Sequence, residues 1–209
     1  MDPIRLKDDN ARVYRQVLHS FARTGQPPTP AALAHVLAIA RDNVEQSLQV
    51  LETDGALYRD PQTRVILAAY PFSATPTPHV VAFPDGHAVY AMCAIDALGM
   101  PVMLNTDARI ESFCTQCGRQ VRVEVKRNAL AEFSPQDAHV WYMQPDACCV
   151  AALEQCPSIN FFCSAEHLEE WRAAHADTQG VPLTMDEAFT HGAKIFGDVL
   201  KQDRNFQAL

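Results

Sequence analysis

A proline-rich stretch, PFSATPTP at residues 71–78, divides this sequence into two parts. Proline lacks a backbone N–H and has a fixed φ, so such a run favours an extended linker. Before it the pattern is mainly helical, with one hairpin, and contains no cysteine. After it strand-like and helical segments alternate, and all seven cysteines follow residue 92. The sequence therefore predicts two domains, 1–75 and 80–209, with the chemistry in the second.

The first part has the pattern of three helices and a hairpin. Apolar residues recur at helical spacing over 9–23, and Thr29 followed by Pro30 is typical of a helix start. Asp42 is a candidate cap for the third helix, and two strand-like segments around Asp60 follow. This order predicts a winged-helix-like domain. The third helix presents mainly carboxylates and amides, and the net charge is -8. Because carboxylates repel phosphates, we expect no nucleic-acid partner.

Hydropathy and the number of cysteines together indicate the cellular compartment. The sequence has no apolar run of about 18 residues and no apolar segment typical of a secretory signal near its start, so we expect no membrane contact and a cytoplasmic protein. An odd number of cysteines cannot form a complete set of internal disulfides. In a reducing compartment, clustered cysteines favour metal binding or catalysis over cross-links.

The second part predicts a mixed α+β domain. HVVAF is typical of a strand, and the apolar run over 89–100 of a buried helix. Residues 107–125 predict two strands joined by a cysteine-containing turn. Ser164 is a candidate cap for the helix that follows it, and a last helix is expected over 184–200.

Cys93 and Asp96 stand three residues apart within the apolar run. Positions i and i+3 of a helix share a face, so the carboxylate could exchange a proton with the thiol. The pair alone leaves a second interpretation open, because buried cysteines are common as small apolar fillers and an aspartate can bond a nearby backbone amide.

A second group of thiols begins with Cys114-Thr-Gln-Cys117-Gly118, a spacing that can bind zinc. A tetrahedral site needs two further ligands. The candidates are Cys156, Cys163, His167 and the adjacent pair Cys148 and Cys149. Cys114, Cys117 and Cys163 are thus candidate ligands of a structural zinc ion.

Three segments together resemble one family. YAMCAIDAL, then ESFC, then EQCPSINFFCS with EHLEEW, are similar to organomercurial lyase (alkylmercury lyase). The resemblance extends from Val80 to the C-terminus, and the helical first part is similar to that family's layout. It implies an alkylmercury-lyase-like catalytic domain with Cys93, Asp96 and Cys156 as catalytic residues, and a structural role for Cys114.

The chain also departs from that pattern. Met92 stands where well-known members carry tryptophan, and Pro157 where many carry a second cysteine. Cys117 and Cys163 are additional thiols. The departures leave the three catalytic positions in place.

The chemistry that the resemblance implies suits these residue types. Mercury is a soft cation and thiolates are soft ligands, so two cysteines can hold the metal while a carboxylic acid protonates the carbon. The expected products are a hydrocarbon and Hg(II), which Cys93 and Cys156 would bind, with no cofactor required. Low-molecular-weight thiols or a mercuric reductase would accept the ion. The alternative is a non-enzymatic zinc-knuckle protein of the same fold with a binding or regulatory role.

Overall fold

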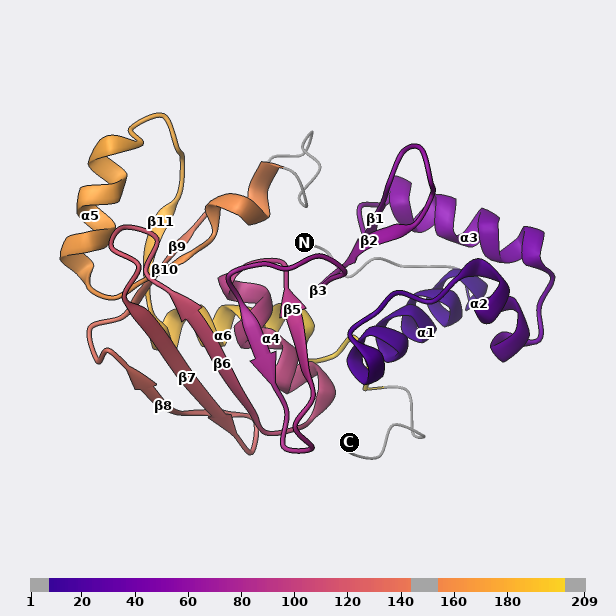
Figure 1. The fold of residues 1–209 in the computed structure, drawn as a ribbon, viewed down its shortest axis with the longest axis horizontal. Coiled ribbons are helices and arrows are strands. Elements are labelled where there is room, and N and C mark those ends of the chain that lie inside the picture. Colours follow the sequence, from indigo (N-terminus) through magenta and orange to yellow (C-terminus); the bar gives the residue numbers. More distant parts are fainter. Residues whose placement is uncertain (1–7, 144–153, 202–209) are drawn as a thin grey trace.

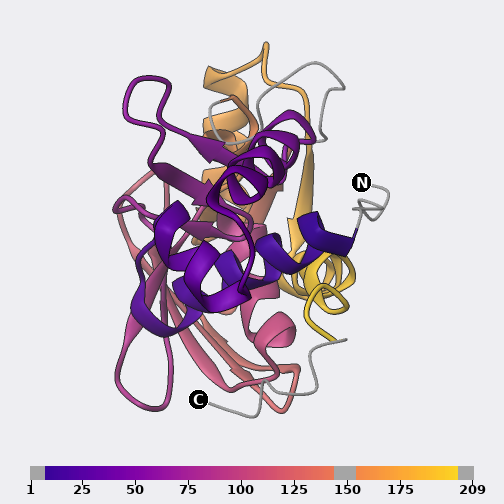
Figure 2. The ribbon, with the colours of Figure 1, turned by 90° about the vertical axis from the view of Figure 1, so that its right-hand side faces the viewer.

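The computed structural model describes residues 8–143 and 154–201. Figure 1 shows the first three helices and the first two strands on one side and the remaining strands and helices on the other, and Figure 2 shows the molecule from the side of those first helices. The helices are α1 (Asp8–Thr24), α2 (Pro30–Leu37), α3 (Arg41–Thr53), α4 (Ala94–Leu104), α5 (Ala165–Ala174) and α6 (Met185–Phe196), with a short 3-10 turn η2 (Cys156–Ser158). None of the helices within these ranges is long and apolar enough to cross a bilayer.

The strands form two antiparallel sheets. The larger sheet has the order β1-β2-β3-β5-β4-β6-β7-β8, and the smaller the order β10-β9-β11. The strands are β1 (Leu57–Arg59), β2 (Ile66–Ala69), β3 (Phe72–Ser73), β4 (Val80–Ala82), β5 (Ala88–Ala91), β6 (Ala108–Phe113), β7 (Gln120–Lys126), β8 (Ala129–Ser134), β9 (His139–Tyr142), β10 (Phe161–Phe162) and β11 (Val181–Thr184). The predicted α+β class is confirmed.

The first part has the predicted element order, three helices and a hairpin. The Thr29 hydroxyl accepts a hydrogen bond from the Ala32 N–H at 3.1 Å, so it caps α2 as predicted. The prediction for α3 was wrong in detail: Ala40 is its N-cap, without a side-chain bond, and Asp42 lies in the first turn. There a carboxylate still interacts favourably with the helix dipole. The assignment of a winged-helix-like domain to these elements stays a prediction.

Acidic side chains of α3 hold the hairpin. The fully buried Arg59 guanidinium on β1 binds Glu45 at 2.5 Å and Glu52 at 3.0 Å, and Arg64 in the hairpin loop binds Glu52 at 2.6 Å. A buried guanidinium needs such partners, because an unpaired charge out of water is costly. Glu45 and Glu52, two of the carboxylates on the third helix, thus stabilise the packing of the hairpin against that helix.

The proline-rich stretch is not a free linker throughout. Phe72 and Ser73 form β3, which pairs with β2 on one side and β5 on the other. The larger sheet therefore continues from the first part of the chain into the second. The Phe72 ring also stacks on Phe21 of α1, with the ring centroids 5.5 Å apart. The division into domains 1–75 and 80–209 stays a prediction.

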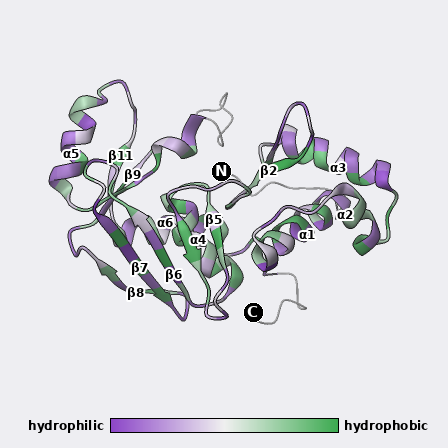
Figure 3. Cartoon of the chain, viewed as in Figure 1, coloured by the Kyte–Doolittle hydropathy of each residue, from purple (hydrophilic) through white to green (hydrophobic). Residues whose placement is uncertain are grey.

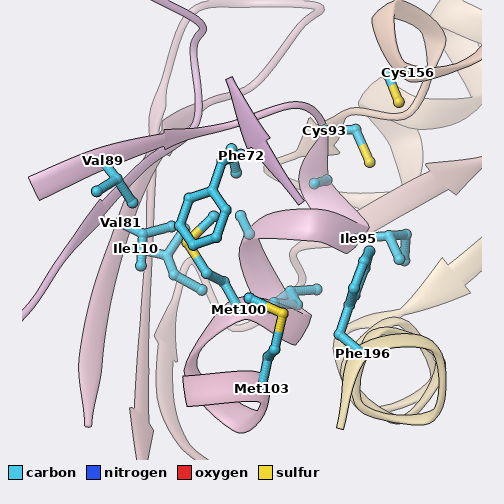
Figure 4. Close-up of a cluster of buried hydrophobic side chains, with 14 of the residues drawn as sticks. Phe72, Val81, Val89, Cys93, Ile95, Met100, Met103, Ile110, Cys156 and Phe196 are labelled. Carbon is cyan, nitrogen blue, oxygen red and sulfur yellow. The ribbon is translucent and has the colours of Figure 1, made fainter. Parts of the chain in front are cut away.

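Helix α4 lies at the centre of the second part, between the larger sheet and α6 (Figure 1). Its residues are apolar and buried almost throughout, which Figure 3 shows as a hydrophobic segment in the middle of the molecule. In Figure 4 the side chains of Ile95 and Met100 point into a cluster with Phe72, Ile110 and Phe196. Such a helix, apolar on every side, is stable only when covered on every side.

Two glycines allow α4 and α6 to touch. A Cβ added at Gly99 would lie 2.7 Å from the Gly192 carbonyl oxygen, and one added at Gly192 would lie 2.7 Å from the Ile95 carbonyl oxygen. Real Cβ atoms do not approach so closely. The backbone of the helix that begins the candidate site is therefore fixed directly by the backbone of α6.

Candidate active site

Cys93 is the N-cap of α4, not a residue inside a helix. The predicted helix over 89–100 was wrong in its first part, because Ala88–Ala91 form β5 between β3 and β4. The chain turns at Cys93 (φ -153°, ψ 178°), and the helix starts at Ala94. The Asp96 N–H donates a hydrogen bond to the Cys93 sulfur at 3.4 Å. The thiol thus stands where an oxygen usually caps, at the positive end of the helix dipole.

Cys156 approaches the same point from a distant part of the chain. It opens η2, and the Ala94 N–H donates to the Ile159 carbonyl at 3.1 Å, which ties that turn to the start of α4. The Cys156 thiol donates to Asp96 Oδ2 at 3.9 Å. Figure 4 shows the two sulfurs on neighbouring segments.

The three predicted catalytic residues therefore meet. The two sulfurs and a carboxylate oxygen of Asp96 all lie within 4.8 Å of one another. All three side chains are buried, with exposed fractions of 2% for Cys93 and 5% each for Asp96 and Cys156. Two soft ligand atoms and one proton carrier share a small, nearly dry volume.

Burial controls the protonation of this cluster. It raises the pKa of Asp96 from 3.8 to about 7, although hydrogen bonds from the two cysteines counteract part of the shift. It also raises the pKa of Cys93 well above its ordinary value, helped by the neighbouring Cys156 and Asp96. Cys93 consequently rests as a thiol, and Asp96 changes charge close to neutral pH.

Tyrosines that the sequence patterns did not single out surround the cluster. Burial, and next the neighbouring Cys156 and Asp96, raise the pKa of Tyr70 far above its ordinary value. Its backbone carbonyl accepts a hydrogen bond from the Tyr14 hydroxyl of α1 at 2.8 Å. Tyr142 on β9 also has a raised pKa, through burial and then through Cys93 and Asp96. These phenols stay neutral donors, and no spacing in the sequence predicts their position.

The remaining described cysteines form a separate group at the predicted turn between β6 and β7. The ligand atoms of Cys114, Cys117, Cys163 and His167 lie within 4.8 Å of one another. Of the candidate partners for the turn, the structure thus brings Cys163 and His167 there, whereas Cys156 belongs to the other cluster. Cys148 and Cys149 lie outside the described residues.

The comparisons with known proteins agree with one another. The family model of alkylmercury lyase (MerB) matches residues 72–197. An alkylmercury lyase of Staphylococcus epidermidis is 29% identical over 163 residues, which cover 78% of this chain and 73% of that protein. One of Pseudomonas putida is 29% identical over 182 residues, or 87% of this chain and 82% of that protein. The crystal structure of the mercury-bound form of MerB2 matches with a TM-score of 0.81 and 26% identity, and covers 94% of both chains.

Proposed function

The chain belongs to the alkylmercury lyase family of enzymes, and we propose that it cleaves carbon–mercury bonds by protonolysis with Cys93, Cys156 and Asp96. The observation that carries the proposal is the buried cluster of two thiols and one carboxyl group within 4.8 Å. A hydrocarbon and Hg(II) are the products. The similar MerB2 was crystallised in a mercury-bound form, which supports binding of Hg(II) here by Cys93 and Cys156.

The proton and ligand balance of this reaction needs all three groups. The Asp96 carboxylate takes the proton of Cys93, and the Cys93 thiolate binds mercury. It displaces the resting thiolate ligand, which leaves as a thiol with this first proton from Asp96. Cys156 then binds the metal as a second thiolate and gives its own proton to Asp96, 3.9 Å away. Asp96 delivers this proton to the carbon as the carbon–mercury bond breaks. The electron pair of that bond goes to the hydrocarbon, and Hg(II) stays on two sulfurs.

The surroundings of Asp96 support its double role. A general acid works best when its pKa is close to the working pH, and burial raises the pKa of this carboxyl group to about 7. The Asp96 N–H bond to the Cys93 sulfur stabilises the thiolate as it forms, because an N–H donates more strongly to an anion.

The proposal extends to partners and architecture. No cofactor takes part. Hg(II) leaves to low-molecular-weight thiols or to a mercuric reductase, because only competing thiolates displace so soft a cation from two cysteines. A reducing compartment such as the cytoplasm keeps both cysteines reduced. Helices α1–α3 with the β1–β2 hairpin make up a winged-helix-like domain, which the order of these elements supports.

The test is release of benzene from phenylmercury in excess thiol at pH 7, with Hg(II) affinity measured in parallel. Asp96→Asn keeps both sulfurs, so it should bind Hg(II) almost normally while benzene release falls by about 10²–10⁴. Cys156→Ser loses one soft ligand, so both affinity and release should fall. Cys93→Ser should release no benzene.

Asp186→Asn, at an exposed carboxylate of α6, is the matched control and should keep full activity. Normal benzene release by Asp96→Asn would contradict the role of Asp96 as proton carrier. Retained turnover by Cys93→Ser would overturn the assignment of the site.

A further inference from the structure

We infer that Cys114, Cys117, Cys163 and His167 form a structural zinc site that is separate from the catalytic cluster. The Cys117 and Cys163 sulfurs are 3.6 Å apart, and His167 Nδ1 lies 3.0 Å from the Cys163 sulfur and 3.8 Å from that of Cys114. With zinc–sulfur bonds of about 2.3 Å and zinc–nitrogen bonds of about 2.0 Å, the edges of a tetrahedral Cys₃His site are about 3.5–3.8 Å. The 3.6 Å and 3.8 Å distances agree with these edges, whereas the 3.0 Å distance is shorter. All four ligand atoms lie within 4.8 Å of one another, so small shifts would place them at the corners of such a tetrahedron.

The backbone holds two of these ligands independently of any ion. The Gly118 N–H donates to the Cys114 carbonyl at 2.8 Å, and the Cys114 N–H to the Arg119 carbonyl at 2.7 Å. Gly118 has φ +73°, a conformation that glycine adopts without strain. This closed turn presents Cys114 and Cys117 from one side, as zinc-binding turns do.

The other two ligands come from the start of α5. Ser164 caps that helix through the His167 N–H at 3.2 Å, which fixes the first turn and places His167 four residues after Cys163. Cys163 lies outside the helix, directly before the cap, and its sulfur is 3.0 Å from His167 Nδ1, so the two ligand atoms lie together beside the turn. The Thr115 N–H also donates to the Phe161 carbonyl at 3.1 Å and fixes the turn against β10.

The chemistry of this donor set selects the ligand. Three thiolates and one imidazole in a tetrahedron suit zinc, whereas oxygen-seeking cations such as magnesium do not favour sulfur. All four positions are protein ligands, as in closed structural sites, so no coordination position is left for a substrate. The ion would cross-link the β6–β7 hairpin of the larger sheet to α5, which follows β10 of the smaller sheet.

The test uses the full-length chain, purified without mercury and under reducing conditions. Metal analysis should find one zinc ion per chain, and a strong chelator should lower the melting temperature by on the order of 10 °C, because metal-binding free energy adds to folding free energy. Cobalt(II) replacing zinc should give the intense visible bands of a tetrahedral thiolate site.

Variants locate the ion. Cys117→Ser changes an exposed ligand and should lose zinc, as should His167→Ala. Cys93→Ser/Cys156→Ser removes the catalytic sulfurs and should keep one zinc ion. Gln116→Ala is the control within the turn: it removes the bond from Gln116 to Glu170 on α5, at 3.2 Å, but no ligand, so zinc should stay.

Three results would overturn the inference. One is a chain with no zinc and a melting temperature that the chelator leaves unchanged. A second is a Cys117–Cys163 disulfide, with no zinc bound, in protein purified under those reducing conditions. The third is zinc that disappears in Cys93→Ser/Cys156→Ser and persists in Cys117→Ser. None of these readouts depends on carbon–mercury cleavage.

Discussion

Asp96 makes the fold depend on pH in a direction unusual for an aspartate. Its pKa is about 7 in the folded protein and near 3.8 in an unfolded chain. Between these values the folded state keeps a proton that the unfolded state has lost. The free energy of unfolding therefore falls as pH rises, by about 1.4 kcal/mol per pH unit, and levels off above pH 7.

We predict that Asp96→Asn removes this slope, because an amide does not titrate. The buried His79 acts in the opposite sense in both proteins, since burial lowers its pKa from 6.5 to about 4 and stability from it rises as pH rises. The difference between wild type and variant isolates Asp96. Urea unfolding from pH 4 to 8 should show the variant gaining a few kcal/mol relative to wild type. Parallel curves for the two proteins would contradict the raised pKa.

At the scale of residues, the sequence predicted which side chains meet and missed how they are held. Cys93, Asp96 and Cys156 were predicted through a family resemblance, since nothing local links positions 96 and 156. The helical i, i+3 argument gave the right neighbours for an inexact reason, because Cys93 caps the helix. Tyr70 was not predicted, because its place beside Cys156 depends on how distant segments pack.

At the scale of elements, the contact of α4 with α6 positions the start of the site. We predict that Gly192→Ala destabilises the protein by about 3 kcal/mol, a drop of roughly 6–12 °C in melting temperature, because its Cβ would lie 2.7 Å from the Ile95 carbonyl oxygen and 2.9 Å from the Gly99 nitrogen. Neither is a flexible side chain. Turnover should fall as well, since residues 95 and 96 are adjacent on α4.

The matched control for this change is Lys194→Ala, at an exposed position on the same helix, which should melt like wild type. Thermal unfolding and benzene release measured on both variants decide the matter. An unchanged melting temperature in Gly192→Ala would show that the two helices can separate without cost.

Element types were predictable where the local signal was strong. The caps at Thr29 and Ser164 and the strand–turn–strand around Cys114 are confirmed. The apolar run over 89–100 misled because pairing of β5 with both neighbours outweighs a helical pattern in its first residues. No pattern predicted β8 or β11: β8 pairs at the sheet edge, and most of its residues are exposed.

At the scale of the whole molecule, the two parts of the chain share structure across the predicted boundary. β3 pairs with β5, Phe21 stacks on Phe72, and the His87 side chain contacts the Ala22 carbonyl at 2.7 Å. We predict that a chain shortened to 76–209 does not fold cooperatively, because β5 loses a neighbour and the apolar surface under α1 becomes exposed to water. Near-ultraviolet circular dichroism would measure the loss of fixed tertiary packing in the shortened chain, and thermal unfolding would measure the loss of cooperativity.

Co-expression with the fragment 1–75 is the control for that experiment, and it should restore a cooperative melt. A sharp melt of 76–209 alone would instead support two independent domains, 1–75 and 80–209. The continuity of the sheet was not predictable, because a two-residue strand within a proline-rich stretch leaves almost no pattern in the sequence.

Residue 96 contacts the two sulfurs through two different groups: its peptide N–H donates to Cys93, and its carboxylate interacts with Cys93 and Cys156. Almost any exchange of its side chain leaves the peptide group in place. Saturation mutagenesis at this codon would therefore test the contribution of the carboxylate but not that of the peptide N–H. The hydrogen bond from the Asp96 N–H to the Cys93 sulfur can be removed only by changing the main chain, for example by an amide-to-ester replacement introduced by semisynthesis.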